Sequence, residues 1–297
     1  MDLEDGQNKQ FLEGDDSETP REICDGKYLV GCEIGRGGFG IVYRCIDKET
    51  KQADACKCIQ LEDDEIGDND DGDDGVNDDI QEVYVMRNIR HPNIVGLKDV
   101  HVDKESMQIV MELCEGGNLY DRMAARGPFT ERIAANIFKT VVQVIDELHR
   151  NGVMHRDMKP QNLLLVDENE DSVLKVSDFG LSVCFEPGEK FDEVVGDIHY
   201  LAPEIINKNY GPEADIWSAG VILYTMLSGY NPWSAHTYED TGRLILKGEL
   251  NLSTYPWPKI SKSAKKLIRK VLVHDLSKRL TAQQILVHPW LQMNANK

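Results

Sequence analysis

The chain has 297 residues, 41% of them hydrophobic, so it can bury one large core or two modest ones. Its formal net charge of -19 argues against a nucleic-acid-binding protein, because that function needs a basic face. The seven cysteines lack metal-ligand spacing, the N-terminus lacks the features of a signal peptide, and no apolar run reaches membrane-spanning length. We therefore expect a cytoplasmic protein, with the nucleus as a further compartment, that binds neither nucleic acid nor membrane.

The first 24 residues are mostly polar and acidic and contain few large apolar side chains. Such a composition cannot bury enough apolar surface to order itself, so we predict a disordered tail over 1–24. Strand signals begin at 28–30, where aromatic and β-branched residues gather.

A glycine-rich stretch follows, with Gly35, Gly37 and Gly40 in the pattern G-x-G-x-x-G. Alone this pattern is weak evidence, because it also opens dinucleotide-binding units. Here the residues after it, 42–46, read as a strand and not as a helix, which favours a β-hairpin. Glycines allow such a hairpin to approach phosphates without Cβ clashes.

The next strand is predicted over 53–59. Alternation along a strand puts Ala55 and Lys57 on one face and Cys56 and Cys58 on the other. A lysine on a strand is usually a solvated charge. This one stands 17 residues after the last glycine of the glycine-rich stretch, which makes it a candidate for phosphate binding.

Residues 62–79 include eleven acidic side chains, three glycines and no basic residue. The alternative to a loop is a calcium site, but no frame supplies the EF-hand ligands and its glycine together. We predict a disordered, self-repelling loop, without which the net charge would be -8. Helical periodicity follows over 80–89.

Residues 107–114 form an apolar strand pattern that ends at Glu115-Gly116-Gly117, and helical patterns begin beyond. We therefore divide the chain into domains 25–114 and 115–297, with the acidic loop 62–79 inside the first.

The most informative segment is 155–162, His-Arg-Asp-Met-Lys-Pro-Gln-Asn, which follows an amphipathic helical pattern over 134–148. An isolated His-Arg-Asp could be a solvated turn. Here Asp178-Phe179-Gly180 follows sixteen residues past Asn162, directly after a short strand pattern. The two segments together resemble the catalytic loop and the metal-binding Asp-Phe-Gly of eukaryotic protein kinases.

The resemblance covers roughly 28–290, and Lys159 marks the serine/threonine branch. Val110-Met111-Glu112-Leu113-Cys114, the residues after Gly180 and the final His-Pro-Trp look most like plant calcium-dependent protein kinases. The chain ends seven residues after Trp290, so we expect no EF-hands, as in plant phosphoenolpyruvate carboxylase kinases.

The resemblance implies an α+β, bilobal protein-kinase fold: a small antiparallel β-sheet lobe with one helix, and a larger, mainly α-helical lobe. It implies a monomeric, calcium-independent serine/threonine kinase that transfers the γ-phosphoryl group of MgATP to a protein hydroxyl. The alternative is an ATP-binding pseudokinase or scaffold.

The resemblance also implies residue roles. Asp157 would accept the hydroxyl proton, Lys159 would steady the γ-phosphoryl group, and Asn162 and Asp178 would hold Mg²⁺. The nucleotide-binding residues would be Ile34, Gly35, Gly37, Gly40, Val42, Ala55, Lys57, Glu82, Glu112, Cys114 and Leu164. Three supporting contacts are implied as well: Glu82 with Lys57, Asp215 with the backbone of the catalytic loop, and Arg279 with Glu204.

Two departures from the family pattern concern regulation and the substrate side. Asp197 replaces a threonine or serine that bridges Asp157 and Lys159 in the family; a carboxylate there could engage Lys159 or repel Asp157. No serine or threonine lies between 182 and 204, so Asp192 or Glu193 is expected to be the permanent negative partner of Arg156.

Three single positions and one apolar group of residues predict which residues around the target the protein selects. Three positions that carry carboxylates in arginine-selecting relatives hold the neutral Asn118, Gln161 and Thr225 here, so we expect weak selection of arginine. Val194, Ile198 and Leu201 are expected to form an apolar pocket for the residue after the target.

Overall fold

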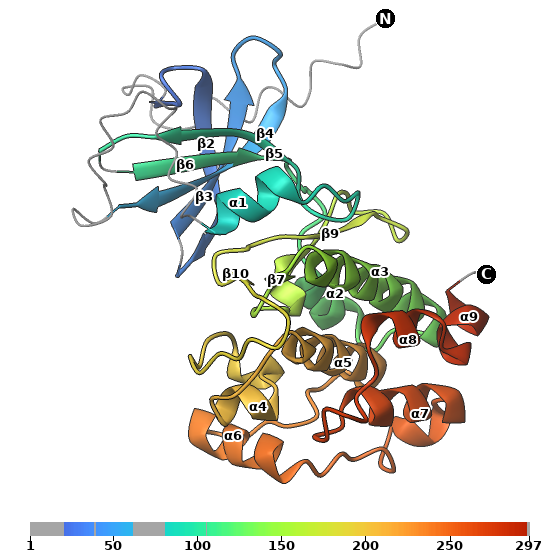
Figure 1. Cartoon of the computed structure of the whole chain (residues 1–297). Coiled ribbons are helices and arrows are strands. Elements are labelled where there is room, and N and C mark those ends of the chain that lie inside the picture. Colours follow the sequence, from blue (N-terminus) through green and yellow to red (C-terminus); the bar gives the residue numbers. More distant parts are fainter. Residues whose placement is uncertain (1–20, 39, 62–80, 105, 296–297) are drawn as a thin grey trace, which may run out of the picture. The chain divides into compact units, whose positions relative to one another are not determined.

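The computed structural model describes residues 21–38, 40–61, 81–104 and 106–295 (Figure 1). The predicted acidic loop 62–79 and most of the predicted tail lie outside these residues. The tail prediction is wrong for its last residues, because Glu22–Ile23 form strand β1 and pair with Tyr28 and Leu29. Ile23 and Cys24 are also buried. Ile23 and Cys24 are ordered because they pack against the sheet. The acidic composition of the segment does not indicate this packing.

The chain divides into two compact units. The first comprises Met1–Val83 and Gly96–Cys114, and the second comprises Tyr84–Val95 and Glu115–Lys297.

The first unit is a six-stranded antiparallel sheet with the order β1-β2-β3-β4-β6-β5 (Figure 1). The buried cluster on one face of the sheet includes Cys45, Cys56 and Val110. Helix α1 runs from Gln81 to Asn88 and crosses the division between the units. The remaining strands are β2 (Tyr28–Gly37), β3 (Gly40–Asp47), β4 (Ala53–Gln60), β5 (Leu97–Val102) and β6 (Ser106–Met111).

The second unit is mainly helical. Its helices are α2 (Leu119–Arg126), α3 (Glu131–Arg150), α4 (Pro203–Ile206), α5 (Glu213–Ser228), α6 (Tyr238–Lys247), α7 (Lys262–Val271), α8 (Ala282–Leu286) and α9 (Pro289–Asn294). Two short antiparallel pairs carry the loops of interest: β7 (Val153–Met154) with β10 (Val183–Cys184), and β8 (Leu163–Leu165) with β9 (Leu174–Val176).

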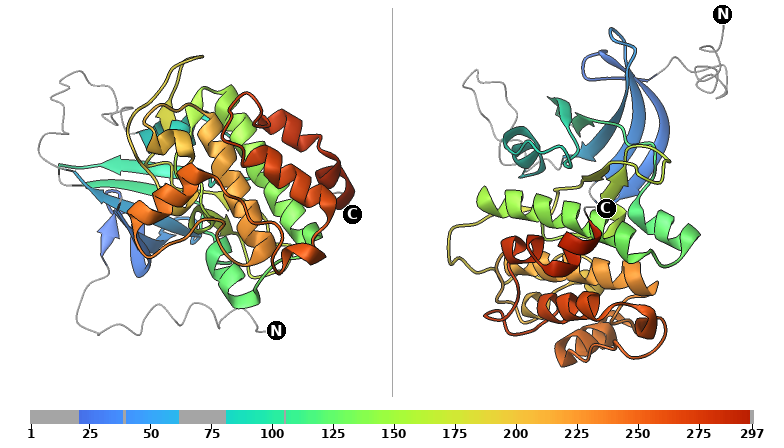
Figure 2. Two further views of the ribbon diagram at one scale, coloured as in Figure 1. Left: turned by 90° about the horizontal axis from the view of Figure 1, so that it is seen from below. Right: turned by 90° about the vertical axis from the view of Figure 1, so that its right-hand side faces the viewer.

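Helix α5 lies at the centre of this unit. Every residue from Ala214 to Ser228 is buried, which explains why its sequence is apolar on all sides. It packs against α3 and α7, and α3 packs in turn against α8 and α9 (Figure 2). The largest fully buried side chains, Trp217, Trp257 and Trp290, belong to this helical core.

The antiparallel sheet of the first unit and the helices of the second form the α+β arrangement that the sequence predicts. Over the described ranges, no helix is both long and apolar enough to cross a membrane.

Candidate active site

The catalytic-loop segment lies between β7 and β8, and its polar side chains converge on Asp157. The Lys159 ammonium is 2.6 Å from Oδ2 of Asp157, and the Asn162 amide donates to the same oxygen at 3.0 Å. The amide of Asn162 also donates to the backbone carbonyl of Asp157 at 2.9 Å. Asp157 is only 4% exposed, so these donors compensate its buried charge and fix its orientation.

The backbone of this segment is held by Asp215 at the N-terminal end of α5. Its carboxylate accepts hydrogen bonds from the N–H groups of His155 (2.9 Å) and Arg156 (3.0 Å). Arg156 has φ of +63°, a conformation that non-glycine residues adopt only when the surroundings compensate its cost. The predicted contact of Asp215 with this loop is therefore confirmed.

Asp215 is itself 1% exposed and lies 2.9 Å from Nε2 of His149. Burial raises the pKa of Asp215, but the hydrogen bond and charge of His149, with the hydrogen bond from the backbone of His155, outweigh it, so the pKa lies below its ordinary value. Asp215 therefore stays ionised and keeps its backbone hydrogen bonds.

His155 connects the catalytic loop to the segment that carries Asp178. Its Nδ1 accepts from the N–H of Asp157 at 3.2 Å, and its Nε2 lies 3.2 Å from the carbonyl oxygen of Ser177. The ring also packs on Phe179 with 5.1 Å between centroids. The tautomer protonated on Nε2 satisfies both contacts.

The two candidate metal ligands, Asn162 and Asp178, both supply oxygen. Both hydrogens of the Asn162 amide are used within the loop, so its carbonyl oxygen is the atom suited to a cation. Asp178 has φ of +62° directly before Phe179-Gly180. A carboxylate with an amide oxygen suits Mg²⁺, which binds few protein oxygens and takes the rest from phosphates and water.

In the first unit, Lys57 on β4 and Glu82 on α1 form the predicted pair, with Nζ 2.7 Å from Oε2. Both side chains are buried, 8% and 3% exposed. Ala55, two residues before Lys57, is 5% exposed. The opposite face carries Cys56 and Cys58, as the strand alternation predicts.

The glycines of the β2–β3 hairpin have different roles. A Cβ on Gly37 would meet no atom within 4 Å, so this position leaves open space that a phosphate could use. Gly40, with φ of +130°, lies so close to the carbonyl of Cys58 that any Cβ would overlap it. Gly40 is therefore required by the packing of β3 on β4, and not only by a ligand.

The other predicted nucleotide-binding positions are placed as follows. Ile34 is 46% exposed on β2, and Val42 lies opposite Lys57 on β3. Glu112 and Cys114 follow β6 and are partly buried, and Leu164 lies on β8 of the second unit. The structure thus brings together Asp157, Lys159 and Asn162 in one unit, and Lys57 and Glu82 in the other.

In the described part of the chain, Asp197 pairs through its carboxylate with His199 and not with Lys159. Its carboxylate accepts from the N–H of His199 at 2.9 Å and lies 3.0 Å from Nδ1 of the same residue. Lys159 pairs instead with Asp157. The backbone N–H of Asp197, not its side chain, reaches Asp157, with a distance of 3.3 Å to Oδ1.

Sequence reasoning missed His199, although an aspartate is a preferred N-cap residue of a short helix. Here Asp197 caps the 3₁₀ helix Ile198–Tyr200. Tyr210, whose hydroxyl contacts Arg156 of the catalytic loop, carried no sequence signal.

Arg156 is bound on several sides. Its Nη1 lies 3.0 Å from Glu193 and 3.2 Å from the hydroxyl of Tyr210, and its Nε donates to the carbonyl of Leu181 at 2.6 Å. Of the two acids predicted as its partner, Glu193 makes the contact.

A second predicted pair joins Glu204 to Arg279 in a bidentate contact, with 3.0 Å between Nη2 and Oε2. Arg279 also donates to the carbonyl oxygens of Glu213 (3.0 Å) and Val273 (3.1 Å). The guanidinium carbon lies 5.0 Å from the ring centroid of Trp217. The predicted contact is confirmed.

Two of the three neutral substrate-selection positions have hydrogen-bonding roles within the second unit. Asn118 caps α2 by accepting from the N–H of Asp121 at 2.9 Å, and Thr225 donates to Val221 at 2.9 Å. Oε1 of Gln161 is buried, with no hydrogen-bond partner among the described residues. Of the predicted apolar pocket, Val194 is exposed and Leu201 is buried.

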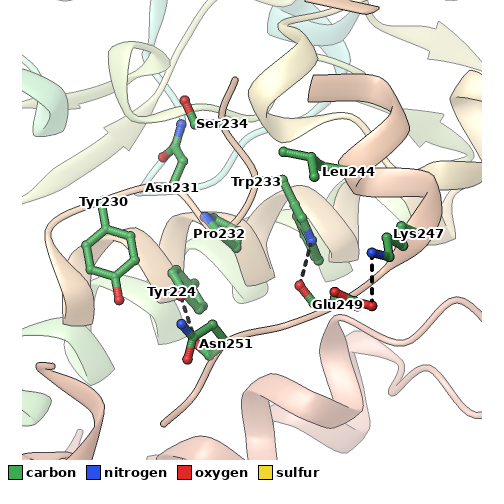
Figure 3. Close-up of a pocket in the computed structure, with 10 residues that line it drawn as sticks. All are labelled: Tyr224, Tyr230, Asn231, Pro232, Trp233, Ser234, Leu244, Lys247, Glu249 and Asn251. Carbon is green, nitrogen blue, oxygen red and sulfur yellow. Dashed lines mark hydrogen bonds and ion pairs between the residues drawn. The ribbon is translucent and has the colours of Figure 1, made fainter. Parts of the chain in front are cut away.

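A pocket of about 510 Å³ lies elsewhere in this unit, near the end of α5 (Figure 3). The indole of Trp233 donates to the carbonyl of Glu249 at 3.1 Å, and Lys247 pairs with the Glu249 carboxylate at 3.2 Å. None of the predicted site residues lines it. Its lining residues are Tyr224, Tyr230, Asn231, Pro232, Trp233, Ser234, Leu244, Lys247, Glu249 and Asn251.

Comparison with known proteins identifies the family. A family model described as protein kinase domain matches residues 28–291. Calcium-dependent protein kinase 32 of Arabidopsis thaliana is 50% identical over 275 residues, which cover 92% of this chain and 50% of that protein. Calcium-dependent protein kinase 3 of Oryza sativa subsp. japonica is 48% identical over 274 residues, which cover 92% of this chain and 48% of that protein. This chain thus spans about half the length of these relatives, and it belongs to the protein kinase domain family.

Proposed function

We propose that the chain is a serine/threonine protein kinase that uses MgATP. The observation that carries the proposal is the cluster of Asp157, Lys159 and Asn162 on a loop that Asp215 anchors. Each group has its charge or donors compensated, as a preorganised catalytic site requires. The similar plant proteins, which are named as protein kinases, support the same activity.

Each residue has a defined task in this proposal. Asp157 accepts the proton of the substrate hydroxyl, and the Lys159 ammonium, bound to the same carboxylate, steadies the transferred phosphoryl group. MgATP, when bound, would supply that phosphoryl group, and its metal would neutralise phosphate charge. Asn162 and Asp178 would hold the metal, while Lys57, oriented by Glu82, would bind phosphate oxygens.

The second candidate function is an ATP-binding scaffold without turnover. It is favoured by Asp197, which stands where the family has a hydroxyl that bridges Asp157 and Lys159. Two contacts argue against this candidate. The Asp197 carboxylate pairs with His199, and Lys159 remains paired with Asp157.

Two measurements separate these candidates. We expect millimolar MgATP to raise the melting temperature, since a ligand that binds only the folded state stabilises it. We also expect transfer of γ-³²P to a basic test protein, lost in Asp157→Asn. A thermal shift without transfer would support the scaffold, and the absence of both would contradict both candidates.

Finer properties belong to the same proposal. We propose that the chain acts as a monomer, that its activity does not respond to Ca²⁺, and that its substrates are proteins with a serine or threonine target. Because Asn118, Gln161 and Thr225 are neutral, we propose weak arginine selection before the target. An activity change of several-fold with EGTA, or strong arginine selection in a positional peptide library, would contradict the corresponding part.

A further inference from the structure

Two cysteines of the first unit lie next to each other on β4. The sulfur atoms of Cys56 and Cys58 are 3.8 Å apart, on the face of the strand opposite Lys57. Cys56 is fully buried in a cluster with Cys24 and Cys45, while Cys58 is partly exposed at the edge of that cluster. An oxidant in the solvent can therefore reach Cys58 first, with a second thiol already in contact.

The two thiols differ in reactivity. The hydrogen bond from Cys56 lowers the pKa of Cys58 to about 7, against the effect of partial burial and with a contribution from the charge of Arg21. The same hydrogen bond, together with burial, raises the pKa of Cys56. The thiolate is the nucleophilic form, so Cys58 is the attacking group and Cys56 the resolving group.

We propose that Cys56 and Cys58 form a redox modification site that a peroxide converts into a disulfide within β4. The Cys58 thiolate attacks one peroxide oxygen; an S–O bond forms, the O–O bond breaks, and the leaving hydroxide takes a proton to become water. The sulfur of Cys56 then attacks the sulfur of the resulting sulfenic acid. The S–S bond forms, the S–O bond breaks, and hydroxide leaves as water with the Cys56 proton. Two thiols give two electrons to one peroxide.

Closing this bond affects Lys57, which lies between the two cysteines. Residues two apart on a strand have Cα atoms about 6.6 Å apart. That separation lies at the upper end of the range that a disulfide spans. Because most disulfides join Cα atoms about 5.5–6 Å apart, we expect the bond to shorten β4 at Lys57 and to shift the ammonium now 2.7 Å from Glu82. This consequence for activity rests on the proposed kinase function, whereas the chemistry of the thiols does not.

The first test is chemical. The full chain is treated with hydrogen peroxide, alkylated and digested with trypsin without reductant. Trypsin cuts after Lys57, so a disulfide would link the peptide ending at Lys57 to the peptide beginning at Cys58. We expect this linked pair, and its loss in Cys58→Ser but not in the matched control Cys32→Ser, which changes an exposed cysteine of the same unit. No linked pair, or a bond from Cys58 to Cys24 or Cys45, would overturn the proposal.

A second measurement covers the case in which a variant folds poorly. In Cys56→Ser the resolving thiol is absent, and we expect dimedone to label Cys58 as its sulfenic acid after peroxide treatment. Labelling that is confined to the exposed Cys32 and Cys184 would contradict the role of Cys58.

For activity, we expect peroxide to lower turnover at least about tenfold, reversibly with dithiothreitol, since a misplacement of about 1 Å can cost about 100-fold. If the disulfide forms and turnover is unchanged, the proposed effect on Lys57 is wrong.

Discussion

Two ion pairs within the described part of the chain, Lys57–Glu82 and Arg279–Glu204, are similarly buried but differ in the contacts around them. In Lys57–Glu82 the side chains are 8% and 3% exposed, and in Arg279–Glu204 they are 1% and 9% exposed. Arg279 is bidentate to its partner and donates to two backbone carbonyls beneath Trp217. Lys57 lies on β4 and contacts Glu82 through its ammonium group.

The difference shows what each pair is suited to do. A guanidinium has five donors in a rigid plane, so it can join three segments permanently. A lysine has a compact charge on a flexible stem, which can leave one oxygen for another, such as that of a phosphate. We therefore regard Arg279–Glu204 as a structural pair and Lys57–Glu82 as a pair for ligand binding.

Removing one partner of the structural pair should lower the free energy of unfolding more than any other substitution considered. Arg279→Met leaves the Glu204 carboxylate buried without its partner, and we expect unfolding to require about 3–5 kcal/mol less free energy. Urea unfolding at neutral pH measures this. In the double variant Arg279→Met with Glu204→Leu, much of the loss should return, because no unpaired charge remains. Equal losses in the single and double variants would contradict the assignment.

Lys57→Met should lower activity more than stability. We expect kcat/KM to fall roughly 100-fold, about 2.7 kcal/mol of transition-state stabilisation. The stability loss should be smaller than for Arg279→Met, because Glu82 lies in the first turn of α1, where the helix dipole favours a carboxylate. Kinetics and urea unfolding of the same samples give both numbers. A stability loss equal to that of Arg279→Met would remove the distinction between the pairs.

Asp215 combines both tasks and should give an intermediate effect. Asp215→Asn weakens the backbone hydrogen bonds to His155 and Arg156, and we expect a loss of about 1–3 kcal/mol in stability. The pKa of Asp215 lies below its ordinary value, so its contribution is present above the unfolded pKa of about 3.9 and is lost as pH falls through the folded value.

The difference between the original chain and Asp215→Asn should therefore be full at pH 5.5 and shrink below about pH 4. Urea unfolding at the two pH values measures it, with the exposed Asp171→Asn as control. A difference that grows on acidification would show that the carboxylate is not stabilised as the structure indicates.

Local patterns predicted β4, because strand alternation depends on neighbouring residues. The Lys57–Glu82 pair was implied only by the resemblance to protein kinases. The same patterns missed β1, since Ile23 and Cys24 are ordered by burial against strands far along the chain. They also did not predict the contact of Asp197 with His199. Which way its carboxylate turns depends on His199 and on Gly196, whose φ of +99° sets the backbone direction there. Hydrogen-bond choices of this kind are made by three-dimensional packing and cannot be read from residue types alone.

Position 197 gives a smaller effect that separates charge from shape. If His199 holds the Asp197 carboxylate away from Asp157, His199→Ala should lower kcat several-fold, about 1 kcal/mol. Asp197→Asn in the same background should restore it, because the repelling charge is gone while the capping oxygen remains. Steady-state kinetics of the two variants decides this. If the second substitution lowers kcat further, the Asp197 charge is productive.

The Arg156–Glu193 contact should give the smallest effect, because its acid is mainly exposed. Arg156 is 10% and Glu193 66% exposed in this pair, so solvent screens the attraction. We expect Glu193→Gln to cost less than about 1 kcal/mol of stability and to change kcat less than about threefold. Arg156 keeps its bonds to Leu181 and Tyr210, which hold the segment without the carboxylate.

Added salt should further reduce the difference between Glu193→Gln and the original chain, as for any exposed pair. The matched control is Asp192→Asn, which removes a neighbouring charge without the contact. A loss of activity tenfold or more in Glu193→Gln alone would show that this acid acts as a permanent substitute for a phosphorylated residue.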